Sequence, residues 1–199
     1  MKRHHHSTSS SRKEALGQLR IIGGQWRGHK LHFADVEGLR PTGDRIRETL
    51  FNWLAPVISG AHCLDLFAGS GALGLEALSR GATHAILVEK DPVAAALLKQ
   101  NSASLKTDRA QVIQADASQW LNTFTPERPF DVVFLDPPFA ADLLQPCCDL
   151  LQRPGLLSQN SLVYIETDRH QPPPITPSTW DLFREKIAGQ VCYRLYRCD

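Results

Sequence analysis

Residues 63–78 read CLDLFAGSGALGLEAL, an apolar run that leads into a glycine-rich turn and then into a helix-like pattern. Leu64 and Leu66 predict a buried strand. Gly69 and Gly71 lack a Cβ atom and tolerate positive φ, so the backbone of the turn can approach a ligand closely. The helix that follows would present unpaired N–H groups and a partial positive charge at its first turn. The stretch therefore predicts a strand–turn–helix unit whose turn binds a ligand.

The glycines of this turn are compatible with two kinds of ligand. Gly69, Gly71 and Gly74 fit the dinucleotide pattern G-x-G-x-x-G, and an acid that could bind ribose, Glu89, follows at a typical distance. Asp65 argues against a dinucleotide, because a carboxylate beside the turn would repel a pyrophosphate. The same carboxylate would suit a ligand with an ammonium group, such as the methionine end of S-adenosylmethionine. A structural corner without any ligand is the third interpretation.

Strand-like and helix-like segments alternate after residue 63. Alternation of this kind builds a parallel sheet with helices on both faces. Two further strand-like runs near the end of the chain, separated by Ala188-Gly189, predict an antiparallel hairpin. The predicted strands are 83–89, 110–115, 130–135, 162–165, 182–187 and 191–196, and the predicted helices include 92–105 and 143–151.

The composition is that of one soluble globular domain. The chain has 199 residues, of which 42% are hydrophobic, and this is enough for one α/β domain with a sizeable core. No apolar run reaches the length of a membrane span, and no apolar signal core stands at the N-terminus. The five cysteines form no C-x-x-C pair. We therefore expect reduced thiols in a cytoplasmic protein, and neither a disulfide framework nor a zinc site.

The net charge of +1 is unevenly distributed. Residues 1–60 contain ten Lys and Arg against five Asp and Glu, whereas residues 61–199 contain twelve against sixteen. A basic head on an acidic body predicts contact with a polyanion, although a solubilising tail would give the same pattern. The Ser-, His- and base-rich residues 1–18 predict a disordered tail.

Residues 19–39 predict an N-terminal hairpin, because two strand-like runs flank a Gly-rich bend. Trp26, Arg27 and Lys30 place an aromatic ring among basic groups, a combination that can stack on nucleic-acid bases and neutralise phosphates. The alternative is that Trp26 packs beneath the hairpin while the charges are solvated. We favour a hairpin that docks RNA, followed by a single domain over residues 40–199.

The helix predicted within residues 40–54 begins with an unusual set of charges. Thr42 or Asp44 can cap its first turn. Arg40, Arg45 and Arg47 also stand near its start, where cations oppose the helix dipole. These arginines predict an anion nearby, either the carboxylate of a cofactor or an RNA phosphate. Salt bridges to acids of the same segment, such as Asp44, are the structural alternative.

Four successive predicted strands each deliver a carboxylate to one edge of the sheet, where parallel sheets bind their ligands. These strand ends carry Asp65, Glu89, Asp116 and Asp136. An ionised Glu89 can accept two hydrogen bonds from a ribose diol. Asp116 can accept from an adenine amine or cap the helix that follows it, and Asp91 is expected to be a helix cap. The series predicts a single pocket that recognises hydroxyl and amine donors.

The motif Asp136-Pro137-Pro138-Phe139 is the most specific signal in the chain. Its two prolines remove backbone donors and stiffen the turn. The Asp136 carboxylate and the Pro137 carbonyl can then both accept from one planar amine, and Phe139 can stack on the base that carries this amine. The motif predicts a site for an exocyclic amine of a nucleobase.

These features resemble known methyltransferases. The match to class I S-adenosylmethionine-dependent methyltransferases lies in residues 65–74, Glu89, Asp116 and residues 136–139. The D-P-P-F motif resembles that of enzymes that methylate exocyclic amines of nucleobases. Residues 20–31 and 40–54 resemble the N-terminal signature of the bacterial 16S ribosomal RNA guanine-N2 methyltransferases, the ribosomal RNA small subunit methyltransferase D family.

The resemblance implies a Rossmann-like α/β fold. Its sheet would have seven mostly parallel strands with helices on both faces, a small N-terminal β-hairpin extension and a C-terminal antiparallel hairpin. S-adenosylmethionine would be the cofactor, no metal would be needed, and the substrate would be one guanine of 16S ribosomal RNA, methylated at N2. We further expect a monomer that contacts no membrane and acts on a partly assembled small subunit.

The implied site residues form three groups. Catalytic roles fall to Asp136, Pro137 and Phe139. Cofactor binding falls to Thr42, Asp65, Phe67, Ala68, Gly69, Ser70, Gly71, Glu89, Lys90, Asp116 and Ala117. Contacts with RNA fall to Trp26, Arg27, Lys30, Arg40 and Arg45.

Three other functions are compatible with parts of this pattern. An adenine-N6 methyltransferase acting on DNA or RNA could use the same proline turn. A dinucleotide-dependent oxidoreductase would explain the glycines alone. An RNA-binding assembly factor without catalysis would explain the basic head, but it would leave the motif 136–139 without a role.

Overall fold

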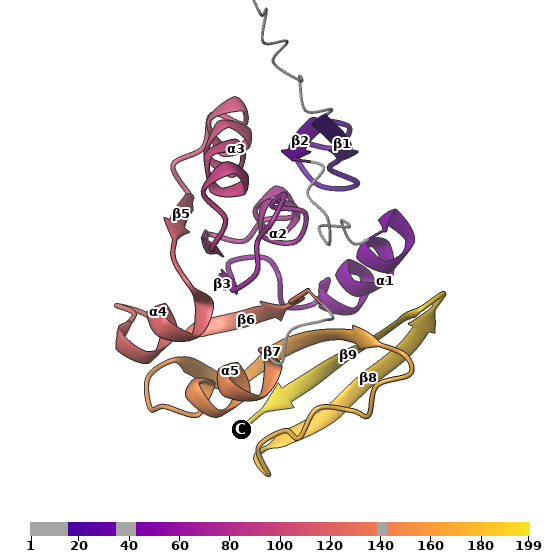
Figure 1. Ribbon diagram of the computed structural model, residues 1–199, viewed down its shortest axis with the longest axis vertical. Helices are drawn as coiled ribbons and strands as arrows, with labels where there is room; N and C mark the ends of the chain where they lie inside the picture. Colours follow the sequence, from indigo (N-terminus) through magenta and orange to yellow (C-terminus); the bar gives the residue numbers. More distant parts are fainter. Residues whose placement is uncertain (1–15, 35–42, 139–142) are drawn as a thin grey trace, which may run out of the picture.

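A computed structural model describes residues 16–34, 43–138 and 143–199. A seven-stranded sheet has the order β5-β4-β3-β6-β7-β9-β8, and the five strands from β5 to β7 run parallel. β9 is antiparallel to both of its neighbours, β7 and β8. This arrangement confirms the predicted α/β fold (Figure 1). The strands are β3 (His62–Asp65), β4 (His84–Glu89), β5 (Ala110–Gln114), β6 (Phe130–Leu135), β7 (Leu157–Asp168), β8 (Trp180–Ala188) and β9 (Val191–Cys198).

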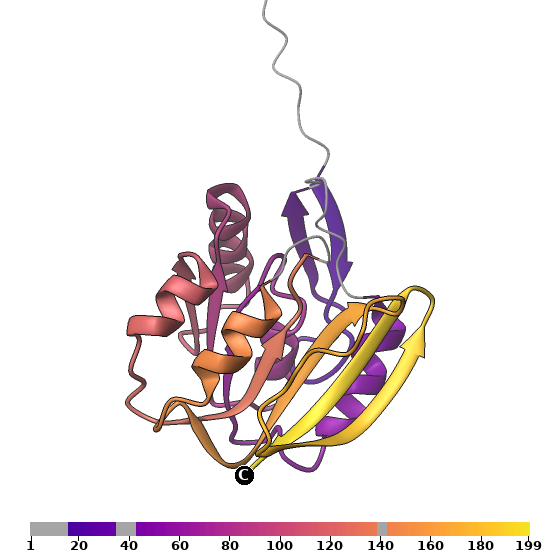
Figure 2. The same cartoon turned by 60° about the horizontal axis from the view of Figure 1, so that its bottom comes forward.

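Helices cover both faces of this sheet, because strand residues alternate between two buried clusters. Cys63 faces a cluster built with α1, α2, α3 and the N-terminal hairpin, whereas Leu64 faces a second cluster built with α4 and α5. The two layers are visible in Figure 2. The helices are α1 (Asp44–Leu54), α2 (Gly74–Ser79), α3 (Pro92–Ser104), α4 (Ala117–Thr123) and α5 (Leu144–Leu151).

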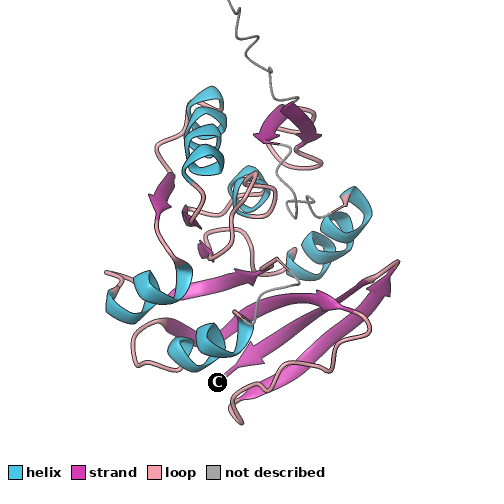
Figure 3. Cartoon of the chain, in the orientation of Figure 1, coloured by secondary structure: helices cyan, strands magenta, loops and turns pink. Residues whose placement is uncertain are grey.

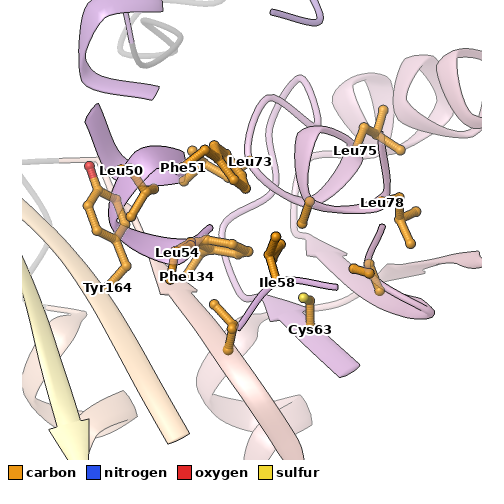
Figure 4. Close-up of a cluster of buried hydrophobic side chains, with 14 of the residues drawn as sticks. Leu50, Phe51, Leu54, Ile58, Cys63, Leu73, Leu75, Leu78, Phe134 and Tyr164 are labelled. Atoms are coloured by element: carbon orange, nitrogen blue, oxygen red, sulfur yellow. The ribbon is translucent and has the colours of Figure 1, made fainter. Parts of the chain in front are cut away.

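The first cluster joins α1 to the centre of the sheet. Figure 4 shows Leu50, Phe51 and Leu54 of α1 beside Phe134 of β6 and Tyr164 of β7. The rings of Phe51 and Phe134 have centroids 6.1 Å apart. Burying large side chains of this kind stabilises the fold by about 1.5–3 kcal/mol each. The helix that carries the basic N-terminal signature is therefore part of the main core.

The predicted hairpin exists and forms its own two-stranded sheet (Figure 3). β1 (Leu16–Arg20) pairs antiparallel with β2 (Lys30–Ala34), with Leu19 opposite Leu31. β1 begins inside the range predicted to be disordered, because its backbone is paired by β2. Leu31 and Ile21 are buried in the first core cluster, so the hairpin packs directly on the sheet-and-helix body.

α1 begins differently from the sequence-based prediction. Its N-cap is Gly43, and no side chain caps it, so the cap predicted at Asp44 is wrong. Asp44 instead pairs with Arg20 at 3.3 Å and with Arg47 at 2.6 Å. The ion pair within the helix is the structural alternative named above, and the buried Arg47 also donates to the Arg20 carbonyl at 3.0 Å. The predicted residues Arg40 and Thr42 lie outside the described residues.

β7 is longer than the predicted strand 162–165. Its first half is polar, but it pairs with β6 from Leu157 onward and with β9 along Ser161–Asp168. Pairing with β6 ends at Ile165, and pairing with β9 alone extends the strand to Asp168, at the edge where the carboxylates lie. Within the described residues, none of the helices combines the length and the apolar character that crossing a lipid bilayer requires.

Candidate active site at the carboxyl edge of the sheet

One cavity of about 800 Å³ lies beyond the carboxyl ends of the parallel strands. The structure brings the four predicted carboxylates, Asp65, Glu89, Asp116 and Asp136, together on its wall. Other predicted residues also line it: Phe67, Ala68, Gly69, Ser70, Lys90, Ala117 and Pro137. These residues come from four strands and from the loops after them. The order of the strands in the sheet therefore determines the spatial order of the residues along the cavity.

The glycine turn is shaped by two residues with positive φ. Gly69 has φ of +49° and donates its N–H to Glu89 Oε2 at 2.8 Å. Gly71 has φ of +82°, and a Cβ atom there would lie 2.5 Å from Leu98 Cδ1 and 2.7 Å from Leu75 Cδ1. Gly71 is not among the lining residues. A glycine is required at position 71 because of its positive φ and its close packing. Of these two glycines, Gly69 is the one that lines the cavity.

Asp65 is almost fully buried, with 2% of its surface exposed. Its Oδ2 accepts from the Gly74 N–H at 3.0 Å, at the start of α2. Within the described residues its Oδ1 has no hydrogen-bond partner. Burial is the main cause that raises the pKa of Asp65 to about 7; the negative charges of Asp136 and Glu89 contribute to this rise, and hydrogen bonds from backbone N–H groups oppose it. An unpartnered acceptor of this kind suits a cationic donor, which would favour the ionised form.

Glu89 builds the turn as well as lining the cavity. Its Oε2 holds the Gly69 N–H, and its Oε1 accepts from the Asp91 N–H at 2.8 Å. Each carboxylate oxygen can accept more than one hydrogen bond. Glu89 can therefore still receive hydroxyl donors, although the sequence did not reveal that it also fixes the backbone of the turn.

Asp116 lines the cavity and also caps α4, so the capping role is confirmed and the contact with an adenine amine stays a prediction. Its Oδ1 accepts from Ser118 Oγ at 2.8 Å and from the Gln119 N–H at 3.2 Å, which caps α4. Lys90 Nζ lies 3.0 Å from its Oδ2. The hydrogen bond from Ser118, followed by that from Lys90, lowers the pKa of Asp116 to about 2. Asp91 caps α3, as expected, by accepting from the N–H groups of Val93 and Ala94.

The proline turn follows β6 at the centre of the edge. Asp136 is half-buried and Pro137 is buried, and both line the cavity. Beside them on β7, the Tyr164 hydroxyl donates to Glu166 Oε1 at 2.7 Å in the interior. Phe139, the predicted clamp for a base, lies outside the described residues.

Comparison with known proteins agrees with this site. The family model described as "Conserved hypothetical protein 95" matches residues 19–197. Over 197 residues the chain is 51% identical to ribosomal RNA small subunit methyltransferase D of Escherichia coli, covering 99% of this chain and 95% of the relative. The chain belongs to the ribosomal RNA small subunit methyltransferase D family. The family protein of Haemophilus influenzae is 49% identical over 185 residues, covering 92% of this chain and 95% of that protein.

The fold of this family member is similar to solved structures of proteins described as methyltransferases or methylases. The Escherichia coli protein yhhF superposes with a TM-score of 0.84 at 50% identity, covering 92% of this chain and 99% of that one. The Haemophilus influenzae protein HI0767 gives a TM-score of 0.77 at 45% identity, covering 92% and 99%. The chain thus has the class I fold of S-adenosylmethionine-dependent methyltransferases, as the resemblance implied.

The residues predicted to bind RNA differ in their surroundings. Arg27, Lys30 and Arg45 are exposed. Trp26 is only half-buried but packs against the first core cluster, and the guanidinium of Arg109 lies 5.2 Å from the centroid of its ring. Trp26 therefore makes packing contacts, as in the alternative interpretation, while its role in RNA binding stays a prediction. The basic residues lie on the surface of the hairpin and of α1.

Several lining residues were missed by the sequence analysis. Leu143 and Cys147 reach the cavity from α5 and the residue before it, and Asp168 and Gln190 reach it from the end of β7 and from the β8–β9 turn. Asp168 is a fifth acid at a strand end, so the same reasoning would have found it had β7 been predicted at its full length. Burial raises the pKa of Cys147 to about 12, as expected for a packing thiol.

Proposed function

We propose that this chain transfers a methyl group from S-adenosylmethionine to the exocyclic N2 amine of a guanine in 16S ribosomal RNA. Membership of the small subunit methyltransferase D family supports ribosomal RNA as the substrate class. The choice of guanine and of its N2 atom is our proposal. The observation that carries it is that the Asp136–Pro137 turn and the carboxylates of β3, β4 and β5 line one cavity.

The donors and acceptors of this cavity fit S-adenosylmethionine. Asp65 offers a buried, unpartnered carboxylate oxygen for an ammonium group. Glu89 offers acceptors for ribose hydroxyls, and the ionised Asp116 offers one for an adenine amine. The apolar surfaces of Ala117 and Leu143 can contact the adenine ring. When bound, the cofactor supplies an electrophilic methyl group that needs no further activation.

Asp136 and Pro137 would prepare the amine that receives this methyl group. A guanine amine is a poor nucleophile, because its lone pair is delocalised into the ring. The Asp136 carboxylate and the Pro137 carbonyl would accept its two hydrogens and thereby fix the direction of its lone pair. The carboxylate would also stabilise the positive charge that develops on nitrogen as the N–CH3 bond forms and the bond between sulfur and the methyl group breaks, and it would accept the proton that this nitrogen then loses. The chain would thus act mainly by orientation and electrostatics.

The target base must leave its stack to reach this turn. We propose that the exposed Arg27 and Lys30 of the hairpin hold the RNA backbone while the base enters the cavity, and that Arg45 adds to this surface. We further propose that a single copy of the chain acts on a partly assembled small subunit. Extrusion of the base costs least where the RNA is not yet locked into its final fold.

A methyl-transfer assay tests the proposal directly. The chain is incubated with labelled S-adenosylmethionine and either deproteinised 16S RNA or small-subunit particles, and the modified nucleoside is identified by mass spectrometry. We expect N2-methylguanosine; N6-methyladenosine would establish the adenine alternative, and no methyl transfer to either RNA form would refute the enzyme. Asp136→Ala should lower turnover by about 100-fold or more while cofactor affinity is maintained. The exposed Asp181→Asn serves as the control, and equal turnover in Asp136→Ala would contradict the assigned role.

A further inference from the structure

The cavity extends past the proline turn to two residues that have no assigned role, Asp168 and Gln190. We propose that Asp168 reads the Watson–Crick edge of the target base and selects guanine over adenine. This inference rests on the function proposed above, and it names the residue that would set base specificity at the same site.

The strand order places Asp168 on the side of the substrate. Along the sheet, the residues at the cavity follow the order Asp116 on the β5 side, Glu89 on β4, Asp65 on β3, Asp136 after β6 and Asp168 on β7. The acceptors that fit the cofactor lie from β5 to β3. Asp168 lies beyond Asp136, on the opposite side of the amine-holding turn. A base whose amine is held by Asp136 and Pro137 must therefore extend toward β7 and β9.

The Asp168 carboxylate is held in a fixed position. Its Oδ1 accepts from the His170 N–H at 2.7 Å, and its residue pairs with Val191 in the β7–β9 ladder. The adjoining turn is closed by the Arg169 N–H, which donates to the Gln190 carbonyl at 2.8 Å. The side chains of His170 and Gln190 also meet, with Nε2 and Oε1 3.2 Å apart. This network fixes the wall of the cavity opposite the cofactor residues.

The chemistry of the two purines differs next to the amine. In guanine the N2 amine adjoins N1–H, so two donors stand side by side. In adenine the N6 amine adjoins N1, which is an acceptor. A carboxylate has acceptors only, so Asp168 can accept the N1–H of guanine but would oppose the lone pair of adenine N1. Gln190 carries an amide whose N–H groups can donate to a carbonyl such as guanine O6.

The experiment changes the target base and the Asp168 side chain separately. The target guanine is exchanged for 2,6-diaminopurine, which keeps the N2 amine but has an acceptor at N1 and an amine in place of O6. This base therefore loses the contacts expected with both Asp168 and Gln190, and the Asp168→Asn variant isolates the share of Asp168. For the wild-type chain we expect kcat/KM for N2 methylation of guanine to exceed that of diaminopurine by roughly 100-fold, since sites built to bind a donor reject analogues that lack it. Asp168→Asn keeps the oxygen that accepts from His170 and adds an amide donor.

In Asp168→Asn we expect the guanine preference to shrink by about tenfold or more, with the affinity for S-adenosylhomocysteine unchanged. Asp181→Asn, on the exposed surface of β8, is the matched control. An unchanged ratio, or an equal loss for both bases, would overturn the role of Asp168. The wild-type protein is measured first. If it methylates neither base at N2, the proposed function is refuted, and the inference about Asp168 is refuted with it.

Discussion

If the buried carboxylate of Asp65 pairs with the ammonium group of the cofactor, as proposed above, cofactor binding should depend on pH. Its pKa is about 7 in the absence of a ligand, because burial disfavours its charge. The ionised fraction is then about one-tenth at pH 6 and about nine-tenths at pH 8. An ammonium group pairs only with the ionised form. We therefore expect the Kd of S-adenosylhomocysteine to fall roughly tenfold between pH 6 and pH 8.

Isothermal titration calorimetry measures this effect in two independent ways. The Kd is determined at pH 6, 7 and 8, and the heat at pH 7 is compared in buffers of different ionisation enthalpy. Binding at pH 7 should release about half a proton, since Asp65 is then half protonated in the free protein. In Asp65→Asn the affinity should be lower and independent of pH over this range. A constant Kd in the wild-type protein, or the same profile in the variant, would refute the assignment of the titrating group to Asp65.

The same shift predicts how the ligand-free protein responds to pH. A carboxyl group whose pKa is raised by folding contributes stability that is present below its unfolded pKa of 3.8 and is lost as the pH rises through about 7. At pH 8 the buried charge would cost at most roughly 4 kcal/mol. Asp65→Asn retains an acceptor for the Gly74 N–H, so it should stabilise the free protein at pH 8 more than at pH 5 in urea unfolding.

Two further predictions concern the N-terminal hairpin. Replacing Arg27 and Lys30 by Gln should weaken RNA binding and reduce the slope of log K against log salt by roughly 1.5, as expected when two phosphate contacts are lost; Lys186→Gln on β8 is the control, and a slope equal to that of the wild type would exclude this docking surface. Gly24→Ala should lower the free energy of unfolding by about 2 kcal/mol or more, since φ is +74° and the new Cβ would lie 1.8 Å from the Ser79 carbonyl. Gly28→Ala has a similar φ of +86° but nothing within 4 Å of its Cβ, so equal losses in the two variants, measured by urea unfolding, would contradict the packing argument.

Local patterns were sufficient to predict the parallel part of the sheet. Buried parallel strands are continuous apolar runs, such as Phe130–Leu135, and glycines or prolines mark where they end. The first half of β7 has no such run, since Leu157–Ser161 is mostly polar. Its strand conformation comes from pairing with β6 and β9, which is a tertiary effect. A separate error at the other end of β7 had the larger consequence. Residues Glu166–Asp168 are polar and are paired only by β9, so the predicted end at residue 165 hid Asp168.

The sequence predicted those residues of the candidate site that stand at the carboxyl end of a parallel strand. Asp65, Glu89, Asp116 and Asp136 needed only the rule that parallel strands present their carboxyl ends at one edge. Cys147 could not be found in this way, because α5 reaches the cavity through packing between helices. The burial of the Arg47 and Glu76 side chains could not be predicted from the sequence either. They lie in the interior with 1% and 0% exposure and approach to 3.6 Å, and a local pattern cannot distinguish such a pair from surface charges.

Buried polar side chains attach the hairpin to α2 and α3, beside the glycine turn. Glu76 accepts from the Ile22 N–H at 2.8 Å, and Ser79 Oγ donates to the Gly23 carbonyl at 2.6 Å. Asn101 holds both backbone groups of His32, at 3.0 and 2.8 Å, and also donates to the carbonyl of Ser70 in the glycine turn at 3.3 Å.

Each of these buried groups would cost about 1–3 kcal/mol if it lost its partner. Swinging the hairpin away from α2 and α3 would leave several of them unpaired at once, in addition to exposing Leu31 and Ile21. The distance between the basic surface of the hairpin and the glycine turn is therefore fixed by the fold. If RNA docks on Arg27 and Lys30, the approach to the Asp136 turn must come from a movement of the nucleotide, and the extruded base supplies that movement.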